Sequence, residues 1–303
     1  MLSTTGSERG RSMTASIDLV IEPRARDLGD FEVRRVLPYA KRREVGPFVF
    51  FDHMGPVVFP AGKGVNVRPH PHIGLATVTY LFEGAILHRD SLGTELSIEP
   101  GAVNWMVAGS GITHSERTSD EDLARDVPME GIQAWIGLPL ADEETAPSFA
   151  HHTAADLPMF DRNGVQYRLI AGNAFEQETP VRVFSPMFYL HGEAPAGTAI
   201  DLPDNHQERA IYVVSGALVV DGDVHDSGKM IVFNADATLD ITATADTRFM
   251  QLGGAPLDGK RTIWWNFVSS DTDRMEAAKA RWKSGGFETV PGDAEEFIPL
   301  PED

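Results

Sequence analysis

The sequence predicts an all-β protein built from two tandem β-barrels, with a short C-terminal helix. Three observations lead to this prediction. Strand-like runs rich in β-branched and aromatic residues alternate with turns over most of the 303 residues. The chain holds 28 glycines and 20 prolines, which suit a turn-rich β architecture better than a helical bundle. A faint internal repeat then relates the first half of the chain to the second.

In the first half, strands are predicted wherever β-branched and aromatic residues run between turns. The run 76–82 (ATVTYLF) stops at Glu83-Gly84, and 85–88 resumes it as the second arm of a hairpin. Further strands are expected at residues 102–107, 112–114 and 131–138. Strand-like runs are then absent between residues 141 and 161, and we interpret this segment as a polar connection.

In the second half, the strand signals return and a helix follows them. Strands are expected at residues 165–171, 187–190, 210–214, 217–220, 230–233, 247–252 and 262–267. The run 271–282 has an acidic first turn, good helix formers and a Gly285-Gly286 stop, so it predicts a helix. The acidic, proline-containing residues 291–303 are expected to form a tail on the surface.

The repeat sets the expected domain division. Residues 77–86 align with residues 209–218, and both segments carry a Tyr, three residues, Gly-Ala and an aliphatic residue. In each half a later glycine, Gly101 or Gly228, precedes another strand. We therefore expect a disordered N-terminus at 1–15, a first barrel at 16–145, and a second barrel with the helix and tail at 146–303.

Composition and charge exclude several classes of function. The formal net charge of −19 repels phosphate backbones, so direct nucleic-acid binding is not expected. No run is apolar and long enough to span a bilayer, and residues 1–15 lack the apolar core of a signal peptide. Without cysteine there are neither disulfides nor thiolate metal sites, and a reducing cytoplasm is the expected location. A monomer is the default expectation.

Two pairs of metal-ligand residues form the most informative pattern. His70 and His72 lie one residue apart, as do His114 and Glu116 further along. Residues i and i+2 of a strand point to the same face, so each pair presents two ligands together. Three imidazoles and one carboxylate suit a divalent first-row metal ion and leave positions open for a substrate or O₂. Glu116 also has the alternative of a surface ion pair with the adjacent Arg117.

The residues around these pairs resemble the cupin motifs. Gly64, the histidine pair and Gly84 follow the first motif, and the turn at Gly111 followed by His114 follows the second. The first motif expects a glutamate where this chain has Thr77, and Glu116 supplies that carboxylate instead. In this position of the carboxylate the chain resembles one cupin subgroup, the pirins. The segments that carry the resemblance are PHPHIGLATVTYLFEGAILHRDSLG, EPGAVNWMVAGSGITHSE and PFVFFDH.

The resemblance, which extends over most of the chain, implies a bicupin that holds iron in its N-terminal barrel. By matching position the ligands are His70, His72, His114 and Glu116, with Fe(II) as the expected ion and manganese, nickel, copper or zinc as alternatives. It also implies cleavage of a flavonol such as quercetin with O₂. In that reaction we expect Glu116 either to stay bound as a ligand or to detach and accept the flavonol proton. The alternative is a non-catalytic, iron-sensing regulator that acts through a protein partner.

The second barrel is expected to lack metal. Extending the repeat places Leu202 and Asp204 at the positions of His70 and His72, and counting from Gly101 and Gly228 places Ile241 at that of His114. His206 lies nearby but out of register.

Other candidate residues receive mostly structural interpretations. His53 either lines the pocket mouth, carries a proton near neutral pH, or is partly buried and hydrogen-bonds to the backbone. His88 is expected to face outward, and His151 and His152 are expected in solvent. Residues expected to line the pocket are Phe50, Met106 and Val107. The pair Trp264-Trp265 is interpreted as packing rather than as part of a substrate site.

Overall fold

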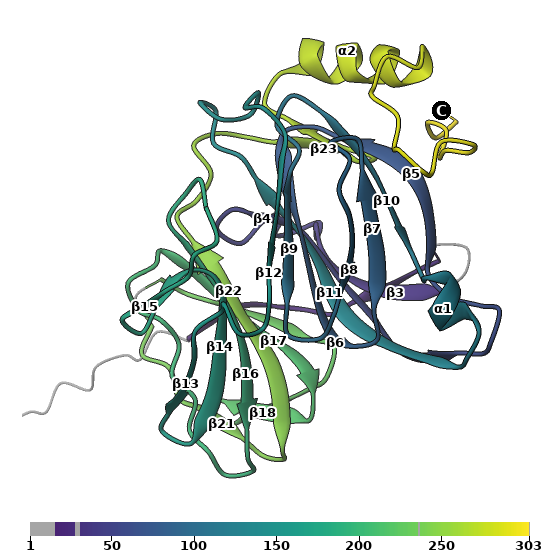
Figure 1. Cartoon of the computed structure of the whole chain (residues 1–303). Coiled ribbons are helices and arrows are strands. Elements are labelled where there is room, and N and C mark those ends of the chain that lie inside the picture. Colours follow the sequence, from purple (N-terminus) through teal and green to yellow (C-terminus); the bar gives the residue numbers. More distant parts are fainter. Residues whose placement is uncertain (1–15, 28–30, 236, 303) are drawn as a thin grey trace, which may run out of the picture.

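Two β-barrels packed side by side make up the molecule (Figure 1). The computed structural model describes residues 16–27, 31–235 and 237–302, so the segment 1–15 predicted to be disordered lies outside the described residues. No helix within the described residues is long and apolar enough to cross a membrane. The prediction of two tandem barrels with a C-terminal helix is confirmed.

The first barrel has a seven-stranded sheet that faces a four-stranded sheet. The larger sheet runs in the order β12 (Ser148–His152), β9 (Val103–Val107), β6 (Leu75–Glu83), β11 (Val127–Gly137), β4 (Phe48–Phe59), β3 (Glu32–Leu37) and β2 (Arg24–Asp27). The smaller sheet runs in the order β5 (Asn66–His72), β10 (Ile112–Arg117), β7 (Ile86–Asp90) and β8 (Glu95–Ile98). A short helix that the sequence did not predict, α1 (Asp120–Leu123), follows β10.

The second barrel repeats this plan with shorter strands. Its larger sheet runs in the order β1 (Ile17–Ile21), β20 (Met230–Phe233), β17 (Glu208–Ser215), β22 (Thr247–Gly254), β16 (Met187–Ala194), β14 (Val165–Ala174) and β13 (Met159–Arg162), with β15 (Gln177–Glu178) beside β14. Its smaller sheet runs in the order β19 (Asp223–Asp226), β18 (Ala217–Val220) and β21 (Ile241–Ala243). The hairpin β23 (Thr262–Trp264) and β24 (Phe267–Ser269) then precedes the helix α2 (Thr272–Lys283).

The internal repeat seen in the sequence is a true structural repeat. In the larger sheets, β9, β6, β11 and β4 are neighbours in the same order as β20, β17, β22 and β16. The strands β6 and β17 both end at a glycine with positive φ, Gly84 (83°) and Gly216 (80°). Glycine tolerates this backbone conformation without steric cost, which explains why it recurs at both turns.

The chain ends cross between the barrels, which corrects the expected assignment of both ends. The strand β1 pairs with β20 of the second barrel, although residues 16–21 were expected in the first. At the other end, Phe267 of β24 bridges to Ile73 of the first barrel. In Figure 1, α2 accordingly lies beyond the end of the first barrel. The pattern of a strand does not indicate which sheet edge a terminal segment pairs with. The segment 16–21 was assigned to the first barrel only because it precedes that barrel in the sequence.

The connection between the barrels is more ordered than expected. The segment 141–161 contains β12 and the start of β13, and β12 pairs with β9 of the first barrel. The strand β12 therefore occupies the same place in the first barrel as β1 does in the second. His151 and His152 lie on β12 and are half-buried, whereas they were expected in solvent.

The main hydrophobic core lies between the two larger sheets. Aromatic side chains from both barrels meet there: the rings of Phe48 and Tyr189 are 5.3 Å apart, and those of Phe51 and Tyr212 are 5.0 Å apart. All four side chains are completely or almost completely buried. The two barrels therefore share one core, and the opposite, smaller sheet of the first barrel is left to build the site described next.

Candidate metal centre

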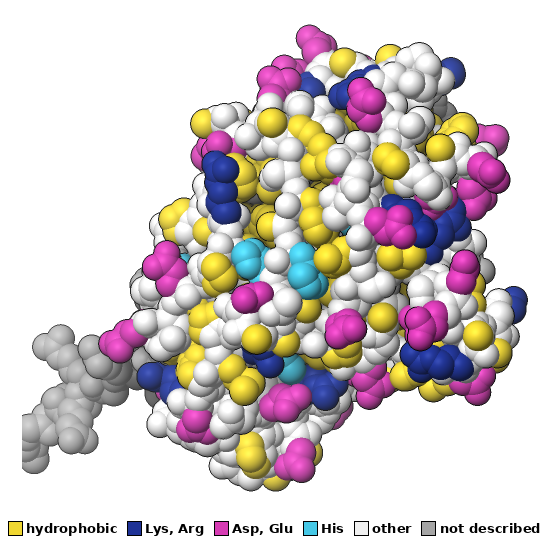
Figure 2. Space-filling model, viewed as in Figure 1, with side chains coloured by type: hydrophobic (Ala, Val, Ile, Leu, Met, Phe, Trp, Pro, Cys, Tyr) yellow, Lys and Arg dark blue, Asp and Glu magenta, His cyan; other side chains and the backbone are white. Residues whose placement is uncertain are grey.

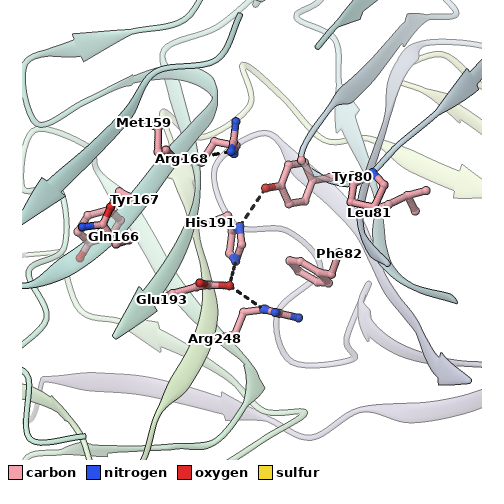
Figure 3. A pocket seen from close by; sticks show the side chains of 12 residues that line it. Tyr80, Leu81, Phe82, Met159, Gln166, Tyr167, Arg168, His191, Glu193 and Arg248 are labelled. Carbon is pink, nitrogen blue, oxygen red and sulfur yellow. Dashed lines mark hydrogen bonds and ion pairs between the residues drawn. The ribbon is translucent and has the colours of Figure 1, made fainter. Parts of the chain in front are cut away.

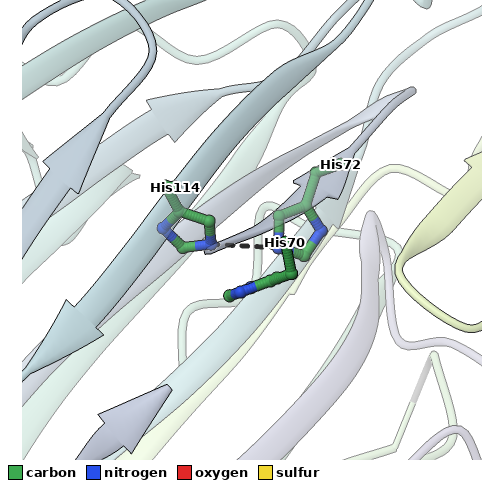
Figure 4. A group of neighbouring side chains, drawn as sticks. All are labelled: His70, His72 and His114. Carbon is green, nitrogen blue, oxygen red and sulfur yellow. Dashed lines mark hydrogen bonds between the residues drawn. The ribbon is translucent and has the colours of Figure 1, made fainter. Parts of the chain in front are cut away.

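Three histidines converge inside the first barrel (Figure 4). His70 and His72 lie on β5 and His114 lies on the neighbouring β10, where it pairs directly with His70. One ligand nitrogen from each lies within 4.8 Å of the others, and all three residues are buried. Within the part of the chain that the structure describes, this is the one group of histidine and carboxylate side chains arranged to hold a metal ion.

Backbone carbonyl groups orient two of these imidazoles. His70 donates from Nδ1 to the carbonyl oxygen of Arg68 at 2.9 Å, and His72 donates from Nδ1 to that of Asn266 at 3.0 Å. Because a carbonyl oxygen only accepts, the proton of each ring lies on Nδ1 and the lone pair on Nε2. Protein ligands to metal ions typically use this arrangement, in which a second contact fixes the tautomer.

The remaining geometry fits a bound ion. His72 and His114 bring their Nε2 atoms to 3.1 Å from each other. Two nitrogen ligands on one ion with bonds of about 2.1 Å are separated by about 3 Å. His114 also has no hydrogen-bond partner at its buried Nδ1. The donor set therefore suits a first-row divalent ion with positions left open.

Burial keeps the three imidazoles neutral, as a ligand must be. It lowers the pKa of His70 to about 4 and lowers the pKa values of His72 and His114 well below their usual range. Neighbouring histidines lower the pKa values of His72 and His114 further. The site is therefore ready to accept a cation at neutral pH without first releasing protons.

Glu116 lies on the same strand but stands apart from the triad. A bulge interrupts the pairing of β10 with β5 between His114 and Glu116, and the carboxylate is not part of the three-histidine group. Thr79 donates a hydrogen bond to it at 3.3 Å, while burial raises the pKa of Glu116. Its ion pair with Arg117 does not form, because Arg117 binds Asp293 at 2.6 Å instead. The role of Glu116 as fourth ligand stays a prediction.

His88 points into the barrel, so the expectation that it faces outward was wrong. It lies within β7, where His88 pairs with Glu116 and Asp90 with His114. Its Nε2 is 3.1 Å from the carboxylate of Asp90, and its ring is centred 5.3 Å from that of His114. The sequence placed His88 at the end of a strand, but the strand continues to Asp90 and its alternation turns both residues inward.

A cavity of about 400 Å³ opens beside the triad. Its lining residues are Phe31, Val33, Arg35, Phe50, Asp52, Met54, Val65, Asn66, Val67, Arg68, His70, His72, Ile86, Glu116, Gln133, Trp135, Trp265, Asn266 and Ile298. Phe50 was correctly predicted, and its ring stacks on that of Trp135 at 4.0 Å. Met106 and Val107 are instead buried in the hydrophobic core, which corrects their assignment to the pocket.

Three lining residues from the C-terminal segment were missed by the sequence analysis. Trp265, Asn266 and Ile298 line one side of the cavity. The interpretation of Trp265 as a packing residue alone was therefore wrong. The tail is held there by hydrogen bonds from Ile298 N to the carbonyl of Pro69 at 2.9 Å and from Trp282 Nε1 to the carbonyl of Ile298 at 3.0 Å. No local sequence pattern signals such contacts, because they depend on the chain returning to the first barrel.

The second barrel offers no equivalent triad within the described residues. The counterpart of β5 shrinks to a single bridge between Ala199 and Thr242. The pairing of β18 with β21 shows that Ile241 occupies the position of Glu116 in the first barrel. Leu239 therefore occupies the position of His114, for which the sequence predicted Ile241. The loop before β21 is two residues shorter than its counterpart, which explains the offset. His206 donates a hydrogen bond from Nε2 to the carbonyl oxygen of Asn173 at 3.1 Å.

His53 belongs to the junction between the barrels rather than to the pocket mouth. It is completely buried and lies 2.9 Å from the Tyr212 hydroxyl of the second barrel and 3.3 Å from Glu130. Arg248 of the second barrel also binds Glu130, at 3.1 Å. A polar cluster therefore ties the two barrels together, so the pocket-mouth position and the backbone hydrogen bond expected for His53 were both wrong.

Comparison with known proteins identifies the family. Residues 30–136 match the pirin family model, and residues 189–288 match the model of the pirin C-terminal cupin domain. The chain belongs to the pirin family. A pirin-like protein of Caulobacter vibrioides is 51% identical over 94% of this chain and 100% of its own length.

Solved structures agree with this assignment. The crystal structure of a quercetin 2,3-dioxygenase from Acinetobacter baumannii matches with a TM-score of 0.87 and 32% identity, covering 94% of this chain and 95% of that one. The bacterial pirin YhhW of Escherichia coli, solved in complex with nickel(II), shares the fold with a TM-score of 0.61 at 19% identity, over 79% of this chain and 99% of that one.

Proposed function

We propose that the protein is a metal-dependent dioxygenase that cleaves a flavonol such as quercetin with O₂. The observation that carries this proposal is the buried triad of neutral imidazoles beside a cavity of about 400 Å³. Cavities of roughly 300–1,000 Å³ are typical of small-molecule sites. The similarity to the Acinetobacter quercetin 2,3-dioxygenase supports the same reaction class.

The ion proposed for the triad is Fe(II), held by His70, His72 and His114 with Glu116 as a fourth ligand. Manganese, nickel, copper and zinc suit the same donors, and the related YhhW was solved with nickel(II). When bound, the ion supplies Lewis acidity toward a hydroxyl group and a path for electrons between substrate and O₂. In this reaction both oxygen atoms of O₂ enter the depside product and one ring carbon leaves as carbon monoxide.

The chain's own residues account for binding and proton transfer. Phe50, Trp135 and Trp265 line the cavity and provide apolar aromatic surface for a planar polyphenol, and they exclude water. Glu116 lines the same cavity, and the raised pKa of its buried carboxyl group brings it closer to the range of a general base. We therefore assign the uptake of the flavonol hydroxyl proton to Glu116.

The test is turnover by protein reconstituted with Fe(II) without oxygen. Quercetin and O₂ are then added, and loss of flavonol absorbance and release of carbon monoxide are followed together. We expect one carbon monoxide per quercetin over many turnovers, and none from the His70→Ala variant. Retention of the metal without carbon monoxide release would contradict the proposal and favour the regulatory alternative.

A further inference from the structure

A second cleft lies at the junction of the barrels, away from the histidine triad (Figure 3). Its volume is about 270 Å³. Both barrels contribute to it: Tyr80 and Phe82 come from β6, Arg168 from β14, His191 and Glu193 from β16, and Arg248 from β22. None of the residues that line this cleft belongs to the metal site or its cavity.

The imidazole of His191 lies in the wall of the cleft between Tyr80 and Glu193 (Figure 3). The hydroxyl group of Tyr80 lies 2.9 Å from Nδ1 of His191. Nε2 of His191 is buried and has no hydrogen-bond partner, since the nearest carboxylate oxygen, on Glu193, is 3.6 Å away. Burial and two nearby arginines lower the pKa of His191 to about 3, so the ring is neutral at pH 7. With Tyr80 donating to Nδ1, the ring proton lies on Nε2 and is directed toward the carboxylate of Glu193 (Figure 3).

An arginine without a carboxylate partner lies opposite. Arg168 donates to the carbonyl oxygen of Ala154, to the sulfur of Met159 at 3.5 Å and to the hydroxyl group of Tyr80, all of them neutral acceptors. Arg248, by contrast, is neutralised by Glu130 at 3.1 Å and by Glu193 at 3.2 Å. The charge of Arg168 is therefore uncompensated among the described residues.

This local charge contrasts with the rest of the molecule. The chain carries a formal net charge of −19, and Asp and Glu side chains are spread over the face in Figure 2. The cleft lining, however, contains two arginines and one glutamate. A partly enclosed positive group of this kind attracts an anion more strongly than an exposed one, because water screens it less.

Aromatic surfaces complete the site. The ring of Phe82 is centred 5.1 Å from that of His191 and 5.6 Å from that of Tyr80. Leu81 and Met159 add apolar surface to the same lining. An engineered apolar cavity of about 150 Å³ holds one benzene molecule, so about 270 Å³ admits one ring with a carboxylate group.

We propose that this cleft binds a small aromatic carboxylate, with the carboxylate on Arg168 and the ring against Phe82. Arginine suits this role because its planar guanidinium group matches a carboxylate with two parallel hydrogen bonds. The site is independent of the proposed dioxygenase activity, since it shares no residue with the metal cavity.

Calorimetric titration of the full chain with benzoate tests the proposal, with neutral benzamide as the matched probe. We expect saturable binding of benzoate, and binding of benzamide at least ten times weaker. Arg168→Gln should weaken benzoate binding at least tenfold, while Arg168→Lys, which keeps the charge, should retain part of it. Thermal unfolding of each variant shows whether the fold is retained.

Two control variants locate the binding. Arg162→Gln removes an arginine of the neighbouring strand β13 that already pairs with Asp201 at 2.7 Å, and it should leave benzoate binding unchanged. Arg68→Gln changes the metal cavity and should also have no effect. Equal binding of benzoate and benzamide, unchanged binding by the Arg168→Gln variant, or loss with Arg68→Gln would each overturn the proposal.

Discussion

Nδ1 of His72 donates a hydrogen bond to the backbone carbonyl of Asn266, 3.0 Å away and 194 residues later in the chain. A candidate metal ligand of the first barrel is thus oriented by the hairpin formed by β23 and β24. That hairpin is anchored by Phe267, which is completely buried, bridges to Ile73 and stacks on Phe287 at 6.1 Å. The C-terminal segment therefore helps to orient the side chains of the candidate metal centre, in addition to closing one side of the cavity.

Loosening this anchor should weaken metal binding. Phe267→Leu removes part of a buried aromatic side chain, and we expect it to lower the free energy of unfolding by about 1–3 kcal/mol. Because the Asn266 carbonyl then orients His72 less well, metal affinity should fall about 10- to 100-fold. Competition with a coloured chelator measures the affinity. Phe249→Leu, at an equally buried site in the second barrel, is the control and should cost similar stability with unchanged metal affinity.

Metal content should depend on the first barrel alone. His114→Ala removes one of the three converging nitrogens, so we expect the protein to lose its bound metal while the β-fold is retained. His206→Ala alters a histidine that hydrogen-bonds to a backbone carbonyl, and the metal content should stay the same. Elemental analysis and circular dichroism check the two variants. Tight metal binding by His114→Ala would refute the ligand assignment, and loss of half the metal from His206→Ala would reveal a second site.

The hydroxyl groups of two buried tyrosines should contribute very differently to stability. Tyr212→Phe leaves Nδ1 of the completely buried His53 without its partner at 2.9 Å, and we expect a loss of about 1–3 kcal/mol in the free energy of unfolding. Tyr189 is also fully buried, but its hydroxyl has no hydrogen-bond partner. Tyr189→Phe should therefore be neutral or stabilising. Urea unfolding compares the two, and equal losses would contradict this account of the interface.

Much of the fold could be predicted because local patterns specify it. The hairpin turns at Gly84 and Gly216 need a backbone conformation that favours glycine, so the repeat left a trace in the sequence. His70 and His72 could be found for the same reason, since alternation along one strand fixes their common face. His114 then followed from the second pair of ligand-type residues.

What could not be predicted depends on contacts between distant segments. Asn266 and Trp265 line the metal cavity only because the chain crosses back from the second barrel. The inward position of His88 could not be predicted, because β7 continues to Asp90, two residues beyond the end of the predicted strand. The cleft around Arg168 and His191 was missed because its residues come from strands of both barrels and follow no common spacing.

The stability of the metal-free protein should fall as the pH is lowered below about 6.5, and His191 should account for part of the fall. Its pKa is lowered to about 3 in the folded state, mainly by burial. Between this value and the unfolded pKa, His191 is protonated in the unfolded chain but neutral in the folded chain. Above the unfolded pKa of about 6.5, His191 is neutral in both states and the free energy of unfolding is at its full value. It decreases as the pH falls from about 6.5 toward 3. Between pH 7.5 and 5.5 this single histidine should lower the free energy of unfolding by roughly 1 kcal/mol. Urea unfolding of the wild-type protein and of His191→Gln at both pH values measures it. The variant should show a correspondingly smaller drop, and identical drops would mean that His191 is protonated in the folded protein.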